Sequence, residues 1–136
     1  MNLELYVPEL CQKFIREHPE EFRSFGCGPG GVGDYLVPDT VYFLSITPAC
    51  RVHDWGYRFS PDASEAARKE HDITLSYNSM RIVRHRYEQT KNKYLYLLRR
   101  RRVKTYYQMV RAFGGQSYWS EGRNEAKDLM EISELL

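Results

Sequence analysis

The sequence predicts a single, mostly α-helical domain over residues 1–136, and three features support this expectation. The pairs Thr47-Pro48 and Ser60-Pro61 are typical of helix starts, because a hydroxyl can cap the first turn and proline is tolerated at the first helical position. The 51 residues at 63–113 contain neither glycine nor proline. A chain of 136 residues can also bury about two thirds of its unfolded surface in one domain.

The N-terminal part of the chain is expected to form one helix followed by an irregular loop. The helix begins at Val7-Pro8-Glu9 and ends before Pro19. The segment 24–34 is dense in glycine, and its run Gly28-Pro29-Gly30-Gly31 can sustain neither a helix nor a strand. The apolar stretches 35–37 and 41–44 are too hydrophobic to leave in water, so we expect a buried extended segment or a short strand there.

The next helix, starting at Thr47-Pro48, carries the chemistry-bearing residues. Cys50, His53 and Tyr57 share one face, since their spacings are three and four. Asp54 lies about 100° further around the helix, so it and His53 serve different partners. A lone histidine on a helix is more often structural, but an imidazole beside a carboxylate favours a base for water and a ligand for a hard cation.

The region 63–113 is expected to form two helices. A single helix of this length would span about 75 Å, too long for a compact domain of this size. The break is placed either at Tyr77-Asn78-Ser79 or around Asn92, giving helices near 63–90 and 93–113. Gly114-Gly115 ends the second helix, and the tail at 116–136 is predicted to contain a short acidic amphipathic helix from residue 121.

Basic residues concentrate in 81–113. Between positions 81 and 111 there are eleven Lys or Arg and one acid, Glu88, a balance of +10, so a net charge of +2 leaves −8 for the rest of the chain. An apolar stripe is expected along the second helix at Leu95, Leu98, Tyr106, Val110 and Phe113. The basic segment has three interpretations: a solvated face that pairs with the acidic remainder, a surface for anionic phospholipid, or a surface for nucleic acid.

No apolar run approaches the roughly 18 residues of a membrane span, and no basic start precedes an apolar segment. We therefore expect a soluble, unprocessed protein that is cytoplasmic, phage-associated or exported by a non-classical route. Cys11, Cys27 and Cys50 allow at most one internal disulfide, which does not fix the redox compartment.

Two motifs carry a resemblance to a known family. The string Cys27-Gly28-Pro29-Gly30-Gly31-Val32-Gly33 resembles the C-G-x-G-G-x-G calcium loop of secreted phospholipase A2 enzymes, and residues 50–57 resemble their C-x-x-H-D-x-x-Y helix. The resemblance covers about residues 24–76, in the family's order, and is closest in style to prokaryotic, phage or viral members. It implies two antiparallel helices, linked by a disulfide or by packing, that carry the site beside a glycine-rich calcium loop, with an additional basic helix.

The resemblance also implies a reaction and its ligands. His53 would deprotonate a water that attacks the sn-2 ester of a glycerophospholipid at a membrane or micelle surface. Asp54 and the backbone carbonyls of Gly26, Gly28 and Gly30 would bind Ca²⁺, which would polarise the ester carbonyl. A Cys27–Cys50 disulfide would hold the loop against the helix, the alternative being two buried reduced thiols.

The resemblance implies that a carboxylate of the second helix orients His53, with Tyr57 supporting it through its hydroxyl. Asp72 is the leading candidate, Glu70 and Asp62 are competitors, and Asp62 is expected to cap the helix. His71-Asp72 repeats the His-Asp pair but lacks the cysteine three residues before it and the tyrosine four residues after the histidine, so it ranks below His53-Asp54.

The sequence also departs from the family's pattern. The gap between loop and helix is longer than in animal enzymes, their many additional disulfides are absent, and Gly26 replaces an aromatic residue. The alternative function is therefore a catalytically silent module that binds nucleic acid, an anionic membrane or a virion partner, with Arg99, Arg100, Arg101 and Arg102 as its basic contacts. A transition-metal phosphohydrolase built from His53, Asp54, His71 and Asp72 is a third, weaker hypothesis.

Overall fold

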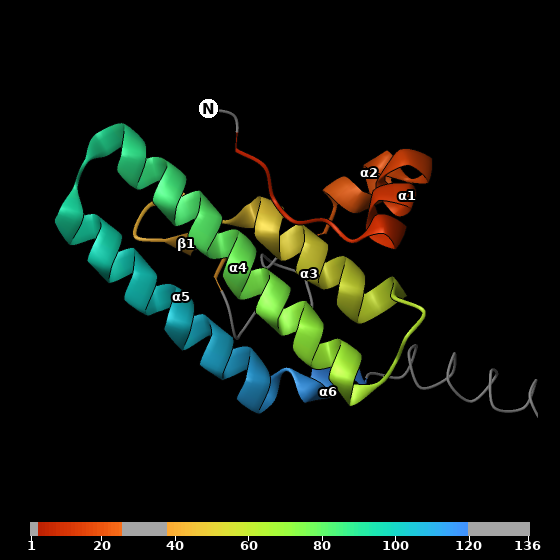
Figure 1. Cartoon of the computed structure of the whole chain (residues 1–136). Coiled ribbons are helices and arrows are strands. Elements are labelled where there is room, and N and C mark those ends of the chain that lie inside the picture. Colours follow the sequence, from red (N-terminus) through yellow and green to blue (C-terminus); the bar gives the residue numbers. More distant parts are fainter. Residues whose placement is uncertain (1–2, 26–37, 120–136) are drawn as a thin grey trace, which may run out of the picture.

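The computed structural model describes residues 3–25 and 38–119, which form a mostly helical structure with a two-stranded sheet (Figure 1). Its elements are α1 (Glu9–Glu17), α2 (Pro19–Arg23), β1 (Thr40–Val41), β2 (Leu44–Ser45), α3 (Thr47–Phe59), α4 (Glu65–Thr90), α5 (Lys93–Phe113) and α6 (Gly115–Tyr118). The predicted mostly α class is confirmed. The glycine loop, the apolar stretch 35–37 and the acidic tail helix lie outside the described residues.

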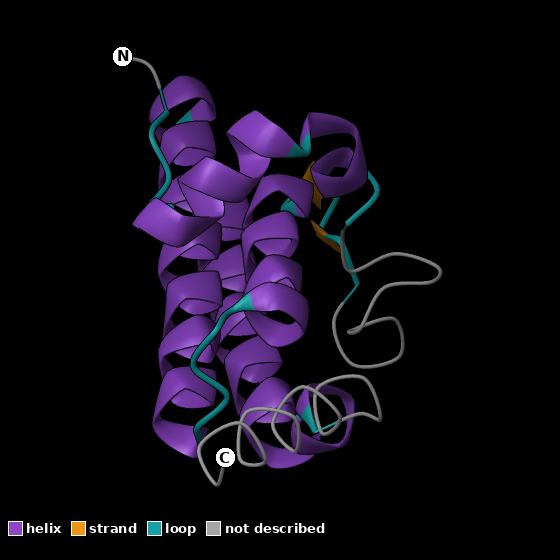
Figure 2. Cartoon of the chain, turned by 90° about the vertical axis from the view of Figure 1, so that its right-hand side faces the viewer, coloured by secondary structure: helices purple, strands orange, loops and turns teal. Residues whose placement is uncertain are grey.

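Three helices form the frame of the molecule. α4 packs against α3 on one side and against α5 on the other, and each neighbouring pair runs antiparallel (Figures 1 and 2). The turn between α4 and α5 lies at Asn92, whose Oδ1 accepts a hydrogen bond from the N–H of Leu95 at 3.1 Å, after Lys91 adopts a left-handed φ of 55°. The expected break near Asn92 is confirmed.

The alternative break at Tyr77-Asn78-Ser79 is wrong, because the N-terminal segment satisfies the polar group at its centre. Asn78 is buried within α4, and its Oδ1 accepts from the N–H of Tyr6 at 2.7 Å while its Nδ2 donates to the carbonyl of Tyr6 at 2.8 Å. The polar side chain thus ties the start of the chain to α4 instead of interrupting the helix.

α4 begins two residues later than the expected start at residue 63. The cap is Ser64, whose Oγ accepts from the N–H of Ala67 at 3.1 Å. Asp62, expected to cap the helix, instead accepts from the N–H of Ser64 at 3.0 Å, one step before the helix. The prediction of Asp62 as the cap is therefore wrong.

The stretch 41–44 is a hairpin, not one continuous strand. β1 and β2 pair antiparallel with Val41 opposite Leu44, and the chain reverses at Tyr42 and Phe43, whose φ angles are 45° and 70°. Val41 and Leu44 are buried, but Phe43 at the tip exposes 96% of its surface. The expectation of burial holds for the two strand residues and is wrong for the tip.

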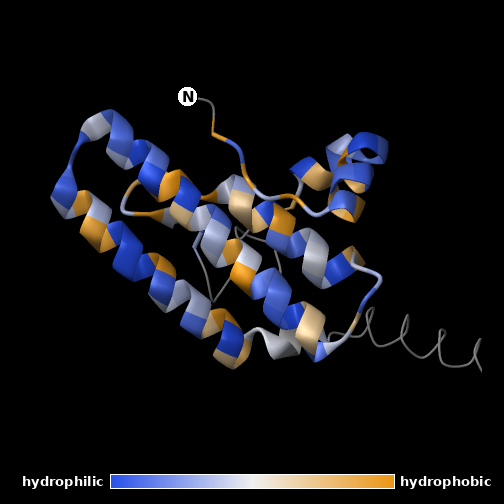
Figure 3. Cartoon of the chain, in the orientation of Figure 1, coloured by the Kyte–Doolittle hydropathy of each residue, from blue (hydrophilic) through white to orange (hydrophobic). Residues whose placement is uncertain are grey.

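The main core lies where the hairpin meets α3, α4 and α5. Its buried members include Val41, Leu44, Ile46, Leu75, Ile82, Val83, Val103, Tyr106 and Val110. A second cluster joins α1 to α3 through Cys11, Phe25, Val52 and Trp55. Figure 3 shows apolar and hydrophilic positions interleaved along α4 and α5, as expected for helices packed on one side.

The apolar stripe expected along α5 is only partly correct. Tyr106 and Val110 are buried, whereas Leu98 and Phe113 are exposed. Arg99, expected among the surface arginines, is buried with Val103 on the inner face. Across the described ranges 3–25 and 38–119, no helix combines the length and apolar character that a membrane span requires.

Candidate active site

The predicted site residues of α3 lie on its buried face. Pro48 stands in the first turn, where its missing N–H costs no hydrogen bond. Cys50, His53 and Tyr57 follow at spacings of three and four and are all buried, as is Asp54. His53 exposes 5% of its surface.

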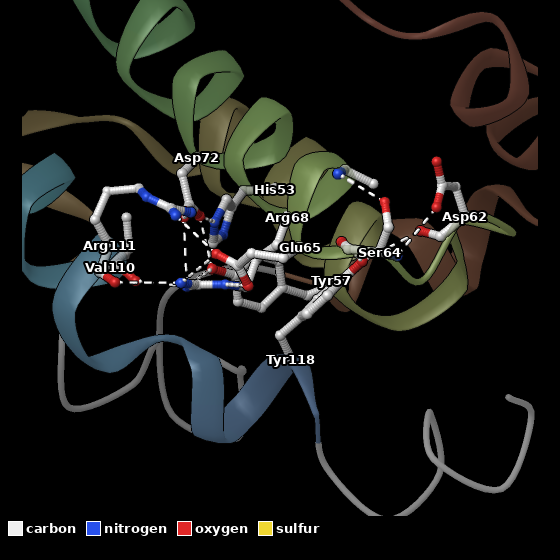
Figure 4. Close-up of polar contacts among 11 residues, drawn as sticks. His53, Tyr57, Asp62, Ser64, Glu65, Arg68, Asp72, Val110, Arg111 and Tyr118 are labelled. Atoms are coloured by element: carbon white, nitrogen blue, oxygen red, sulfur yellow. Dashed lines mark hydrogen bonds and ion pairs between the residues drawn. The ribbon is translucent and has the colours of Figure 1, made fainter.

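α4 brings a carboxylate to this histidine. Nε2 of His53 lies 2.8 Å from Oδ1 of the fully buried Asp72, and the hydroxyl of Tyr57 donates to the same oxygen at 2.6 Å (Figure 4). The predicted trio of His53, Tyr57 and Asp72 is therefore assembled across two antiparallel helices. An ionised carboxylate only accepts hydrogen bonds, so Nε2 is the donor of this bond, and in a neutral imidazole the lone pair is then on Nδ1.

The other oxygen of Asp72 faces a guanidinium from α5. Nη1 of Arg111 donates to Oδ2 of Asp72 at 2.7 Å, and Nη2 of Arg111 donates to Oε1 of Glu65 at 2.8 Å. Glu65 stands in the first turn of α4 and Arg111 in the last turn of α5. Arg111 thus joins the two helices at the level of the carboxylate.

A second guanidinium lies one turn before Asp72 on α4. Nη1 of Arg68 is 3.6 Å from Oδ2 of Asp72, 3.4 Å from the hydroxyl of Tyr57 and 3.0 Å from the carbonyl of Val110. Nε and Nη2 of Arg68 also donate to the two oxygens of Glu65, both at 2.9 Å. Two cations therefore offset the charge of the buried carboxylate.

These contacts set the protonation states of Asp72 and Tyr57. Burial alone would raise the pKa of Asp72, but its hydrogen bonds and charge interactions with His53, Tyr57 and Arg111 outweigh burial and lower that pKa. Burial, the charge of Asp72 and their hydrogen bond raise the pKa of Tyr57. Asp72 is thus held ionised and Tyr57 protonated at neutral pH.

A glycine permits the close approach of the two helices. A Cβ at Gly56 would lie 2.5 Å from Nδ1 and 2.6 Å from Cγ of His71, closer than real contacts allow. His71 also lies edge-on to Trp55, with ring centroids 6.3 Å apart. The ring of His71 therefore packs on α3 at Gly56 and Trp55.

The segment after α5 covers Tyr57. A Cβ at Gly114 would lie 2.8 Å from the hydroxyl of Tyr57. The buried ring of Tyr118 lies 5.0 Å from that of Tyr57, and its hydroxyl donates to the carbonyls of Asp62 and Ser64 at 3.2 Å and 2.9 Å. α6 therefore fixes Tyr57 and the start of α4 together (Figure 4).

Asp54 faces a different partner, as its position around the helix predicted. Its Oδ1 lies 3.1 Å from Nε of Arg58, one turn later on α3. The Arg58 guanidinium also lies 5.6 Å from the ring centroid of Phe25, and the Phe25 carbonyl accepts from Nε of Arg51 at 3.2 Å. Phe25, the last described residue before Gly26, is thus held against α3 by Arg51 and by Arg58, the partner of Asp54.

Of the four expected calcium ligands, only Asp54 lies within the described residues. The carboxylate of Asp54 is buried and lies beside the Arg58 guanidinium. Carboxylate oxygens are among the ligands that Ca²⁺ prefers. Gly26, Gly28 and Gly30 lie outside the described residues. Within residues 3–25 and 38–119, no group of three or more His, Cys, Asp and Glu side chains is arranged to hold a metal ion.

The competing site residues do not join the trio. Glu70 is exposed on α4, and Asp62 precedes that helix. His71 packs against Gly56 and Trp55, so the four-residue transition-metal site does not assemble among the described residues. Among the three candidate acids, Asp72 is the one that contacts His53.

The sequence reasoning missed Arg68 and Arg111. Arg68 precedes Asp72 by four positions, a spacing that places two residues on one helix face, so this pair had a local signal. Arg111 had none, because it lies 39 positions from Asp72.

The two described cysteines, Cys11 and Cys50, are both buried. Cys11 is free and buried, and burial raises its pKa to about 12. Cys50 is fully buried on α3. Cys27 lies outside the described residues, so the Cys27–Cys50 disulfide stays a prediction.

Comparison of the chain with protein-family models, curated proteins and solved structures found no match. Function is therefore inferred from the geometry of the site and from the two sequence motifs.

Proposed function

We propose that the chain is a calcium-dependent hydrolase that resembles phospholipase A2 and cleaves the sn-2 ester of glycerophospholipids. The observation that carries the proposal is the buried contact between His53 and Asp72, with Asp54 next to His53 on the same helix. Antiparallel α3 and α4 fit the two-helix arrangement that the resemblance implies.

His53 acts as the general base. Its Nε2–H is held by Asp72, so Nδ1 is the atom that removes a proton from the attacking water. Asp72 stays ionised and stabilises the imidazolium that forms. Tyr57 holds the carboxylate in place and keeps its own proton, since its pKa is raised.

Asp54 and the carbonyls of Gly26, Gly28 and Gly30 are the proposed ligands of Ca²⁺. When bound, Ca²⁺ supplies positive charge that polarises the ester carbonyl and stabilises the developing oxyanion. The 38% exposed side chain of Arg58 has room to leave Asp54. The anchoring of Phe25 on α3 supports the proposal that the glycine loop starts near this carboxylate.

The test is fatty-acid release from phospholipid–detergent mixed micelles. Wild type is expected to release the sn-2 chain in Ca²⁺ and not in excess chelator, and His53→Ala to lose this activity while keeping its helical circular dichroism. His85→Ala, which replaces a histidine of α4 outside the trio, is the matched control and is expected to keep full activity. Undiminished release by His53→Ala would contradict the role of His53.

The second candidate is a catalytically silent binding module on the same scaffold. The observation that favours it is that both carboxylates of the site already face arginines, Asp54 with Arg58 and Asp72 with Arg111. A folded wild type that releases no fatty acid in Ca²⁺ but binds nucleic acid, an anionic membrane or a virion protein would establish this function.

A further inference from the structure

The tip of the β1–β2 hairpin is a feature that the proposed hydrolysis does not use. Phe43 exposes 96% of its surface, although its φ of 70° lies in the left-handed region that favours glycine and asparagine. Both the backbone conformation and the exposure of a large apolar ring are unfavourable in water. Folding alone does not account for a phenylalanine at this position.

Two arginines of α5 hold the hairpin in place. Arg99 donates to the carbonyls of Val41 and Tyr42 at 3.2 Å and 2.8 Å. Arg102 donates to the hydroxyl of Tyr42 at 3.0 Å, and its guanidinium lies 5.0 Å from the centroid of that ring. The tip that carries Phe43 is therefore fixed beside α5 (Figure 1).

The outer face of α5 also exposes apolar side chains. Tyr94 and Leu97 expose 83% and 52% of their surfaces, and Leu98 is also exposed. Arg101 follows Leu97 by four positions and Lys104 follows Arg101 by three, so they extend the same exposed stripe. We group the exposed Phe43 of the hairpin with these exposed residues of α5 and name the set the hairpin–α5 surface: Phe43, Tyr94, Leu97, Leu98, Arg101 and Lys104.

We propose that the hairpin–α5 surface docks on an anionic lipid bilayer. Binding at a membrane surface combines two kinds of side chain. Apolar side chains enter the boundary of the acyl chains, and exposed cations meet the lipid phosphates. Leu97 and Leu98 favour lipid over nucleic acid, because an aliphatic side chain has no ring on which a base can stack. Arg99 serves the fold and does not contact the lipid.

The test is sedimentation of the full chain with vesicles in excess chelator. Binding to phosphatidylcholine vesicles with about 30% phosphatidylserine is expected to exceed binding to pure phosphatidylcholine about tenfold, and to fall with added NaCl. Phe43→Asn removes the ring but keeps a residue that tolerates the left-handed region, so it should fold normally and bind about fivefold more weakly. Leu10→Gln, at an exposed leucine of α1, is the matched control and should bind like wild type.

Two results would overturn the proposal: equal vesicle binding by wild type and folded Phe43→Asn, or binding of single-stranded RNA without any binding of anionic vesicles. The inference does not rest on the proposed hydrolysis, because the chelator removes Ca²⁺ and binding is measured without turnover. If the protein binds these vesicles but releases no fatty acid in Ca²⁺, the docking surface is supported and the proposed hydrolase activity is refuted.

Discussion

Arg111 donates to Oδ2 of Asp72 at 2.7 Å, while His53 holds Oδ1 of the same carboxylate at 2.8 Å. The carboxylate that orients the candidate base is thus shared between a histidine of α3 and an arginine of α5. A buried charge is stable only when it is paired and hydrogen-bonded. α5 therefore contributes to the site by supplying Arg111, although both sequence motifs of the site lie before α5.

Arg111→Gln should destabilise the protein. The substitution removes the nearer of the two arginines that face the buried Asp72, and losing a charge-assisted hydrogen bond of this kind costs about 2 kcal/mol of unfolding free energy. Urea denaturation measures the loss. Arg101→Gln, on the exposed face of the same helix, should change the free energy by no more than about 0.5 kcal/mol. Equal stability of the two variants would show that Arg111 is dispensable.

Tyr57→Phe should cost about 1 kcal/mol of unfolding free energy, because it removes only the hydroxyl that donates to Asp72 at 2.6 Å. Thermal and urea unfolding measure this loss. Tyr94→Phe removes the hydroxyl of a largely exposed tyrosine and should leave stability unchanged. If the two variants unfold alike, the bond between Tyr57 and Asp72 contributes nothing to the fold.

Gly56→Ala should lower the unfolding free energy by about 2 kcal/mol, because its Cβ would lie 2.5 Å from Nδ1 of His71. His71→Ala removes the ring that the new methyl group meets. A double-mutant cycle should therefore show that Gly56→Ala is much less harmful in the His71→Ala background. Additive effects in this cycle would contradict the close packing of α3 on α4 at Gly56.

The stability of the protein should fall in acid partly through Glu65. Hydrogen bonds from Arg68 and Arg111 lower the pKa of Glu65 from 4.5 to about 2. Glu65 therefore binds a proton more readily in the unfolded chain than in the folded protein. Its contribution to the free energy of unfolding is present above about pH 4.5 and is lost as pH falls towards 2. Melting temperatures of wild type should decline more steeply across this range than those of Glu65→Gln. A residual decline in the variant is expected from Asp72, whose pKa is also lowered.

Local patterns predicted much of the frame and most of the trio. The spacing of Cys50, His53 and Tyr57 correctly placed them on one face of a helix, and Asn92 correctly marked the turn between α4 and α5. Asp72 was selected through the family resemblance, and its contact with His53 was then found in the structure.

What the sequence did not predict depends on long-range contacts. Asn78 resembles a helix breaker until its partner Tyr6, 72 positions away, is known. The turn at Tyr42 and Phe43 lacks the glycine or asparagine that usually marks a hairpin, since Arg99 and Arg102 hold it from outside. Arg111 meets Asp72 only because α5 folds back along α4.

The most direct test of the central claim is the calcium dependence of sn-2 fatty-acid release by wild type and Asp54→Asn. The account predicts that release rises with Ca²⁺ in wild type, stops in excess chelator, and is largely lost in Asp54→Asn, whose neutral amide binds the cation far more weakly. Full release by wild type in excess chelator would contradict the claim.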